Sequence, residues 1–156
     1  MARLRLNTSF FLLSTVGLLA LVAWADSPKT TLPSPPQPGR STFVIKSGGY
    51  DRVAHIQVPK GYVAGSKPPL VLLIHGGGGG GTTILDKDGW AAKADEEGFL
   101  AVAPDGLAAA PKLPTNFKLN PAVWNSGQLR SGTPRTAIDD VVFFRELLDD
   151  LKDKIP

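Results

Sequence analysis

A histidine followed by six consecutive glycines is the part of this 156-residue chain best suited to chemistry. His75 ends the apolar stretch Leu70–Ile74 and precedes Gly76–Gly81. A short apolar run that ends in polar residues and glycines is typical of a buried parallel strand. Because glycine has no Cβ, main-chain N–H groups in such a run can face a ligand directly. The pattern therefore predicts a ligand site built from backbone donors.

Three kinds of chemistry compete for a glycine run after a strand. A nucleotide-binding P-loop is excluded, because Thr82 stands where that motif needs its lysine. A dinucleotide fingerprint, GxGxxG, fits residues 76–81, and Asp105 follows at roughly the spacing of about 20 residues expected for a ribose-binding acid. The third chemistry is an oxyanion loop, in which N–H groups of Gly76 and Gly77 stabilise the charge on an attacked carbonyl. A flexible turn with no function is the remaining alternative.

Three acidic residues could serve either chemistry or structure. Asp105 could be a triad acid or a ribose ligand, but it lies in Pro104-Asp105-Gly106, whose residue types favour a turn. Asp139 and Asp140 form a carboxylate pair, yet at the start of a predicted helix their simpler role is capping. We therefore expect a turn at Asp105 and helix caps at the two later residues.

An antiparallel hairpin is predicted to open the domain. Strand-like runs over 42–45 and 53–58 lie on either side of Gly48 and Gly49. Apolar alternation around a glycine turn is typical of two antiparallel strands. His55 lies on the second strand, where we expect it to be half-exposed.

Two buried parallel strands are predicted next, with a short helix between them. The strands cover 70–74 and 99–103, which are apolar throughout. In the helix, Asp88 is expected to be the N-cap and Trp90 to pack in the core. Gly98 is placed to end the helix in the left-handed conformation.

A long loop and a final helix complete the pattern. The loop, Leu107–Arg135, has a length that is usually functional or disordered, and the sequence leaves the roles of its Trp124 and Asn125 open. The helix is expected to begin at Thr136, which has the capping-box spacing to Asp139. The apolar residues predicted to share its buried face are Ala137, Val141, Phe144, Leu148, Leu151 and Ile155. The order of elements predicts an α/β sheet.

The N-terminus has the composition of a secretory signal peptide over residues 1–25. Arg3 and Arg5 supply a basic start, 10–23 is mostly apolar, and residues 23–25 (Ala-Trp-Ala) have the small-x-small form of a cleavage site. The apolar stretch is shorter than the ~20 residues that a spanning helix needs. We therefore expect cleavage and secretion, to the periplasm or the extracellular space, rather than an uncleaved anchor.

Residues 26–40 contain five prolines and predict an extended linker to a domain that spans 41–156. The formal net charge of +3 falls to +1 when the two arginines of the leader are removed. This small charge indicates no nucleic-acid partner. The chain has no cysteine, which excludes disulfides and a lipid anchor at an N-terminal cysteine.

Several short segments recur in the order and spacing of one enzyme family. They are Pro69–Gly81, Gly89-Trp90-Ala91, Glu97-Gly98-Phe99, Val102–Gly106, Trp124-Asn125 and Asp139-Asp140-Val141 with Phe143. From residue 41 to 156 the chain resembles the N-terminal half of the secreted polyhydroxybutyrate depolymerase and feruloyl-esterase-like branch of the α/β-hydrolases. The resemblance implies a partial α/β-hydrolase sheet, with an N-terminal hairpin, two parallel strands and two helices, truncated before the nucleophile strand.

The resemblance also implies roles for the residues at the glycine run. Gly76 and Gly77 would supply the oxyanion-hole N–H, and His75 would support that loop rather than act as the base, because the triad order is Ser, acid, His. The family often has cysteine where Gly77 stands, a mild departure because the N–H does the work. No Gly-x-Ser-x-Gly occurs in the chain, so the nucleophile, acid and histidine are expected beyond Pro156.

The expected function is therefore that of a secreted serine carboxylic ester hydrolase, with this chain inactive alone. Its substrate would be a polyester or a plant polysaccharide ester carrying feruloyl or acetyl groups. We expect no metal, no organic cofactor and no membrane contact after cleavage of the leader. The alternatives are a dinucleotide-binding oxidoreductase fragment and an exported binding domain without catalysis.

Overall fold

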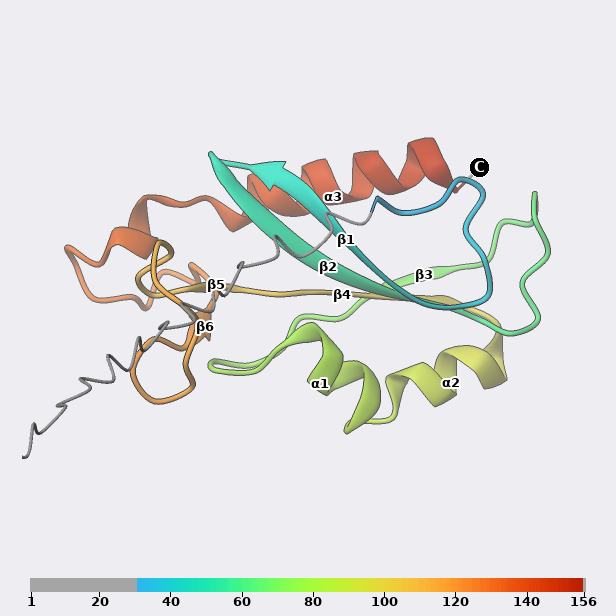
Figure 1. The fold of residues 1–156 in the computed structure, drawn as a ribbon, viewed down its shortest axis with the longest axis horizontal. Coiled ribbons are helices and arrows are strands. Elements are labelled where there is room, and N and C mark those ends of the chain that lie inside the picture. The colour runs from blue at the N-terminus through green and yellow to red at the C-terminus, as the bar shows by residue number, and fades with distance from the viewer. Residues whose placement is uncertain (1–30, 156) are drawn as a thin grey trace, which may run out of the picture.

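A computed structural model describes residues 31–155, so the predicted signal peptide lies outside the described residues. The fold is mixed α/β, with a mixed sheet that carries α3 on one face and α1 and α2 on the other (Figure 1). The elements in chain order are β1 (Gly39–Ser47), β2 (Tyr50–Val58), β3 (Leu70–Leu72), α1 (Gly81–Asp86), α2 (Trp90–Glu97), β4 (Leu100–Pro104), β5 (Leu107–Ala108), β6 (Ala122–Val123), the 3-10 helix η1 (Pro134–Ala137) and α3 (Asp140–Lys154). The predicted α/β class is confirmed.

The main sheet has the strand order β1-β2-β4-β3. The predicted hairpin is confirmed: β1 and β2 are antiparallel, and Gly48 and Gly49 both take the left-handed conformation that a tight hairpin turn requires. β4 is antiparallel to β2 and parallel to β3, with Val71 opposite Ala101. Among residues 31–155, β3 has a strand partner on one side only, so it forms an edge of the sheet.

The two faces of the sheet bury side chains of different size. The face under α3 buries Leu32, Phe43, Ile45, Ala54, Ile56, Val58, Leu100, Val102, Phe143, Leu147 and Leu151. The face under α1 and α2 buries Leu73, Leu85, Ala94, Ala101 and Ala103. Alanines on β4 let α1 approach the strand closely. This close approach brings the glycine run against the carboxyl end of β4.

The final helix begins later than predicted and presents a different face. Asp139 is the N-cap, accepting hydrogen bonds from the N–H groups of Val141 and Val142, whereas Thr136 lies in η1. Of the predicted apolar face, Leu151 is buried and Phe144 and Ile155 are partly buried against the core, but the face is centred on other residues. The buried face comprises Asp140, Phe143, Leu147 and Leu151. The first residue of the observed buried face, Asp140, is a carboxylate, so a pattern of apolar residues does not include it. Val141, expected inside, is exposed.

The predicted helix between the parallel strands is two helices. α1 directly follows the glycines, and α2 begins after Gly89, so Asp88 is not the N-cap that the sequence suggested. Gly98 ends α2 with φ 76°, which confirms the left-handed cap. Trp90, predicted in the core, is exposed, with its ring in edge contact with Phe99 at 6.4 Å between centroids.

The end of the proline-rich segment lies against the domain. Leu32 is part of the core cluster and Pro36 is fully buried. The Ser34 hydroxyl donates to the carbonyl of Lys154 at 3.3 Å. Strand β1 begins at Gly39, two residues before the expected start of the domain. These contacts attach residues 32–36 to the end of α3.

Candidate functional site

The glycine run forms the wall of a pocket at the carboxyl end of the parallel strands. It leaves β3, turns, and enters α1 (Figure 1). The pocket has a volume of about 410 Å³. It is lined by His75, the glycines from Gly76 to Gly80, Thr83, Ile84, Lys87, Asp88 and Phe117. In open α/β sheets, this end of the strands is where ligands bind.

Packing or backbone conformation restricts three of the last four glycines of the run, Gly78, Gly79 and Gly81. A Cβ on Gly81 would lie 2.1 Å from the carbonyl oxygen of Ala103, and one on Gly79 would lie 3.1 Å from that of Gly76. Gly78 has φ 76°, and a Cβ there would lie 2.7 Å from the ring of Phe117. By contrast, Cβ atoms on Gly76 and Gly77 would meet nothing within 4 Å. Those two residues leave their backbone open to the pocket.

The backbone N–H groups of Gly78, Gly79 and Gly81 are occupied by protein acceptors. The N–H of Gly78 donates to Ala122 at 2.7 Å, that of Gly79 to Gly76 at 3.0 Å, and that of Gly81 to the Asp105 carboxylate at 2.6 Å. Within residues 31–155, the N–H groups of Gly76, Gly77 and Gly80 donate no hydrogen bond. Gly76 and Gly77 are the two residues that the sequence analysis singled out, and both line the pocket.

His75 is buried, and protein groups occupy both of its ring nitrogens. Nε2 accepts a hydrogen bond from the N–H of Gly106 at 2.9 Å. Since Nε2 is an acceptor, these contacts assign the proton to Nδ1, which lies 2.7 Å from the carbonyl oxygen of Gly76. The imidazole thus ties the start of the glycine run to the residue after β4. It has no nitrogen left to take a proton from a nucleophile.

Trp124 braces the residue before the glycine loop, and Asn125 braces the segment that leads into α3. The Trp124 ring lies 5.0 Å from that of His75, and its Nε1–H donates to the His75 carbonyl at 2.8 Å. The Asn125 amide group donates to the carbonyls of Thr136 and Ile138 at 3.1 Å. Both residues of the long loop are therefore bracing residues, which answers the question that the sequence left open.

Asp140 is the centre of a buried charge cluster that the sequence analysis missed. Its carboxylate pairs with Arg52 at 2.9 Å and with Arg135, and it accepts the N–H of Asn125 at 2.6 Å. Burial alone would raise the pKa of Asp140, but the hydrogen bonds from Arg135, Asn125 and Arg52 lower it below its usual value. The predicted capping role belongs to Asp139 alone. Alternation along β2 carried the available signal, since it places Arg52 on the same face as Ala54.

Asp105 connects the end of β4 to the glycine run, and the turn predicted at this residue does not form. One oxygen accepts the Gly81 N–H and the other lies 3.3 Å from His55 Nε2, while His55 Nδ1 lies 2.8 Å from the Thr42 hydroxyl. Burial alone would raise the pKa of Asp105, but the hydrogen bonds from His55 and Gly81 lower it below its usual value. His55 is buried, which corrects the expected half-exposed position. Thr42, His55 and Asp105 share residue types with hydrolase triads, but none of them lines the glycine pocket.

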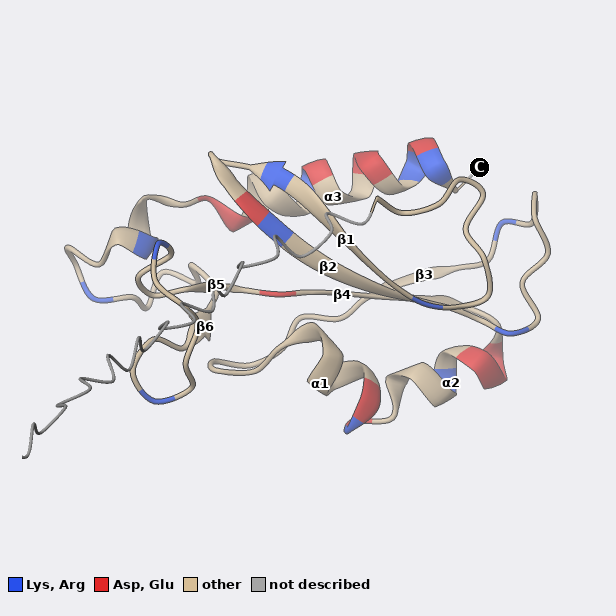
Figure 2. Cartoon of the chain, viewed as in Figure 1, with Lys and Arg blue, Asp and Glu red and all other residues tan. Residues whose placement is uncertain are grey.

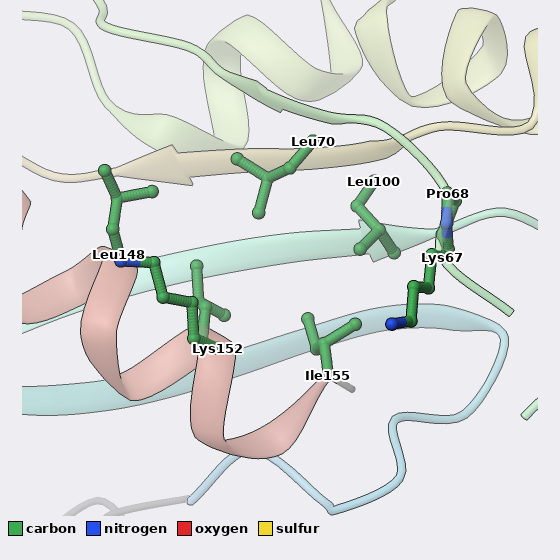
Figure 3. Close-up of a pocket in the computed structure, with 8 residues that line it drawn as sticks. Lys67, Pro68, Leu70, Leu100, Leu148, Lys152 and Ile155 are labelled. Carbon is green, nitrogen blue, oxygen red and sulfur yellow. The ribbon is translucent and has the colours of Figure 1, made fainter. Parts of the chain in front are cut away.

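A second cavity lies at the open edge of β3 (Figure 3). Its volume is about 460 Å³, and its lining comprises Lys67, Pro68, Leu70, Leu100, Leu148, Leu151, Lys152 and Ile155. The lining contains no nucleophile, acid or histidine. Although this cavity is the larger of the two, the chemistry favours the glycine pocket as the candidate site.

Two further observations bear on function. In the part of the chain that the structure describes, no group of three or more His, Asp or Glu side chains could hold a metal ion. No helix within residues 31–155 is long and apolar enough to cross a membrane. Neither a protein-family model nor a curated protein matches the chain.

Proposed function

We propose that the domain is the oxyanion-hole part of a secreted serine carboxylic ester hydrolase of the α/β-hydrolase fold. The position of His75-Gly76-Gly77 carries this proposal. The three residues follow the third strand and precede the first helix. In α/β-hydrolases, an oxyanion-hole N–H comes from the loop between the third strand and the first helix. The free N–H of Gly77, open to the pocket, suits that role.

The sheet supports the same proposal. An antiparallel hairpin precedes two adjacent parallel strands, and β3 is left at an edge among the described residues. In an α/β-hydrolase, the strand that bears the nucleophile would pair with this edge. The proposal therefore places the Gly-x-Ser-x-Gly segment, the acid and the catalytic histidine outside residues 1–156, as the resemblance implies.

The proposed mechanism assigns one step to the residues described here. A serine Oγ attacks the ester carbonyl while a histidine takes its proton, and negative charge develops on the carbonyl oxygen. The N–H of Gly77, together with the N–H after the nucleophile, would donate to that oxygen. His75 keeps the loop in place through its bonds to Gly76 and Gly106. Ile84 and Phe117 in the pocket favour an ester with an apolar or aromatic acyl group.

The dinucleotide alternative has less support. The helix after the glycines, α1, has only six residues. Asp105, the candidate ribose ligand, instead accepts the N–H of Gly81 and pairs with His55. An antiparallel hairpin also occupies the side of β4 that a parallel strand would take in a doubly wound sheet.

Two measurements test the proposal. The 156-residue chain alone should leave p-nitrophenyl butyrate unhydrolysed and should not react with a fluorophosphonate probe. Expressed together with the downstream reading frame, the protein should hydrolyse the ester and carry the probe on one serine. A folded, extended protein that neither reacts with the probe nor cleaves esters would contradict the proposal.

A matched pair of variants in the extended protein tests the Gly77 N–H. Gly77→Pro removes that donor, and kcat should fall by about 10²–10³, the usual effect of losing one oxyanion-hole donor. Gly77→Ala keeps the N–H and meets no atom within 4 Å, so it should retain activity. Equal activity in the two variants, with equal melting temperatures, would show that this N–H is not in the oxyanion hole.

A further inference from the structure

The loop between β5 and β6 holds three large apolar side chains in solvent. Leu113, Phe117 and Leu119 are 62%, 73% and 89% exposed. They lie within residues 110–120, the segment that we call the apolar loop. It projects from the end of the molecule that carries β5 and β6, opposite the connection between β2 and β3 (Figure 1). Scattered surface leucines are ordinary, but three large apolar residues exposed on one short loop indicate an interaction surface.

This loop is ordered by its own hydrogen bonds. The Asn120 side chain is buried, accepts the N–H of Ala110 at 2.8 Å and donates to the carbonyls of Ala110, Leu113 and Pro114 at 3.0–3.2 Å. Asn116 Oδ1 accepts the N–H groups of the two residues at 118 and 119, each at 3.0 Å. The loop is therefore held open, with its apolar side chains outward, instead of folding them onto the domain.

The charged residues between Asp105 and Asp139, the stretch of sequence that includes the apolar loop, are all basic. No aspartate or glutamate occurs between Asp105 and Asp139, whereas Lys112 and Lys118 lie within the loop. Both lysines are exposed, and within residues 31–155 neither forms an ion pair. Figure 2 shows the contrast with α3, where acidic and basic residues alternate. An apolar tip flanked by unpaired lysines is complementary to a surface that is both apolar and negatively charged.

We propose that the apolar loop binds reversibly to the surface of an anionic lipid membrane. Leu113, Phe117 and Leu119 would enter the acyl boundary, and Lys112 and Lys118 would contact lipid phosphates. A neutral apolar partner would not require a loop that lacks acidic residues and carries two lysines. The positive charge of the loop therefore favours an anionic lipid surface. The expectation of no membrane contact was drawn from cleavage of the leader, residues 1–25. This loop is a separate segment, and the proposal replaces that expectation here.

The position of Phe117 links this surface to the candidate site. The ring lies against Gly78 and lines the glycine pocket. A membrane bound at the loop would therefore lie beside the pocket opening. The proposal does not depend on ester hydrolysis, because the loop contacts and charges are the same if the pocket binds another ligand.

The absence of cysteine allows a site-specific test on the full chain. Thr115→Cys at the loop tip, and Ala64→Cys on the connection between β2 and β3, would each carry the environment-sensitive dye NBD. Both positions are exposed. With vesicles of 70% phosphatidylcholine and 30% phosphatidylglycerol, the dye at 115 should brighten at least threefold and shift to the blue, whereas the dye at 64 should not. Each dye reports only its own position, so membrane contact by residues 1–25 does not produce this difference.

Two pairs of variants separate the apolar and charged contributions. In the labelled protein, Leu119→Ser and the double variant Lys112→Glu/Lys118→Glu should each weaken vesicle binding at least tenfold. The controls Val63→Ser and Lys67→Glu, exposed residues of the other connection, should not. Leu119→Ser keeps the backbone hydrogen bond to Asn116, so the loop should stay folded.

Three results would overturn the proposal. One is no response at position 115, and another is an equal response at positions 64 and 115. The third is equal binding to vesicles of pure phosphatidylcholine, which would assign the loop to neutral apolar surfaces instead.

Discussion

The two halves of the glycine run are chemically identical and structurally opposite. At Gly78, Gly79 and Gly81, a side chain would meet the domain closely or require a left-handed backbone, whereas a Cβ on Gly80 would make only ordinary contact with Asp105. At Gly76 and Gly77 a Cβ would point into open space, and the N–H groups remain free. Packing therefore explains glycine at positions 78, 79 and 81 and does not explain it at 76 and 77. In a run of identical residues, the positions where packing places no demand are the ones to examine for function.

The largest effect should come from Gly81→Ala. Its Cβ would lie 2.1 Å from the backbone oxygen of Ala103 and 2.7 Å from the His55 ring. Backbone of the central strand β4 must move to accept it, and we expect a loss of more than about 3 kcal/mol in the free energy of unfolding, at or beyond the upper end for overpacking. Urea denaturation followed by circular dichroism measures this. An unchanged midpoint would contradict the division of the run.

Asp105→Ala should cost less, because it removes a hydrogen-bond partner without a clash. The change leaves the N–H of Gly81 and the ring of His55 without their acceptor. Leaving a buried donor unsatisfied costs about 1–3 kcal/mol, and we expect the lower half of that range since the carboxylate is one-third exposed. The same denaturation experiment measures the loss. A change at Asp86, an exposed carboxylate on α1, serves as the control.

The lowered pKa of Asp105 also predicts a pH dependence. Because the folded state binds its proton less readily than the unfolded state, Asp105 adds stability above its unfolded pKa, about 3.9. That contribution is lost as the pH falls through the folded pKa. Asp140 acts in the same direction, so the difference between the parent protein and Asp105→Asn isolates Asp105. The unfolding free energies of the two proteins, measured from pH 6 to pH 2.5, should converge at the acidic end. Parallel curves would contradict the lowered pKa of Asp105.

Gly78→Ala should have an intermediate effect with two separable causes. An alanine would have to adopt φ 76°, which costs about 1–2 kcal/mol, and would also press on Phe117. Since the Phe117 side chain is exposed, its ring can move away, and the backbone cost should dominate. The double variant with Phe117→Ala should therefore recover little stability. Full recovery would assign the effect to the ring contact instead.

The smallest effect should come from Gly77→Ala. The site has open space around the position of the Cβ and a backbone that is not left-handed. Stability should change by no more than about 0.5 kcal/mol, as for an ordinary surface substitution. A loss as large as that of Gly81→Ala would show that both halves of the run are demanded by packing. Thermal unfolding of the two variants side by side gives the comparison directly.

Local patterns predicted those parts of the fold that depend on neighbouring residues. Glycines at 48, 49 and 98 predicted a hairpin turn and a helix end, and apolar runs predicted β3 and β4. The strand predicted over 70–74 is shorter, because β3 ends at Leu72 and Ile74 is exposed. The patterns could not predict Arg52 and Arg135 converging on Asp140, because a carboxylate is buried only where charged partners meet it, and Arg52 lies 88 residues away in the sequence. For the same reason Asp140 was missed as the first member of the buried face of α3.

The candidate site was also predictable only where it depends on residues that are neighbours in the sequence. Strand and glycines located the loop, and the free N–H groups lie where the pattern placed them. The support of that loop comes from Trp124, Gly106 and Asp105, each far from it in sequence. Such contacts leave no periodic signal, and only the three-dimensional arrangement reveals them.

The contact between Trp124 and His75 gives the pocket an intrinsic optical reporter. The indole is partly shielded and hydrogen-bonded to the residue that begins the glycine loop, whereas Trp90 is exposed at the start of α2. In a Trp24→Phe/Trp90→Phe protein, Trp124 is the one tryptophan of the sequence. A shift in its wavelength then records any rearrangement of the loop, without an added label and in real time. Ligands for the pocket can be screened by that shift before any reaction is known.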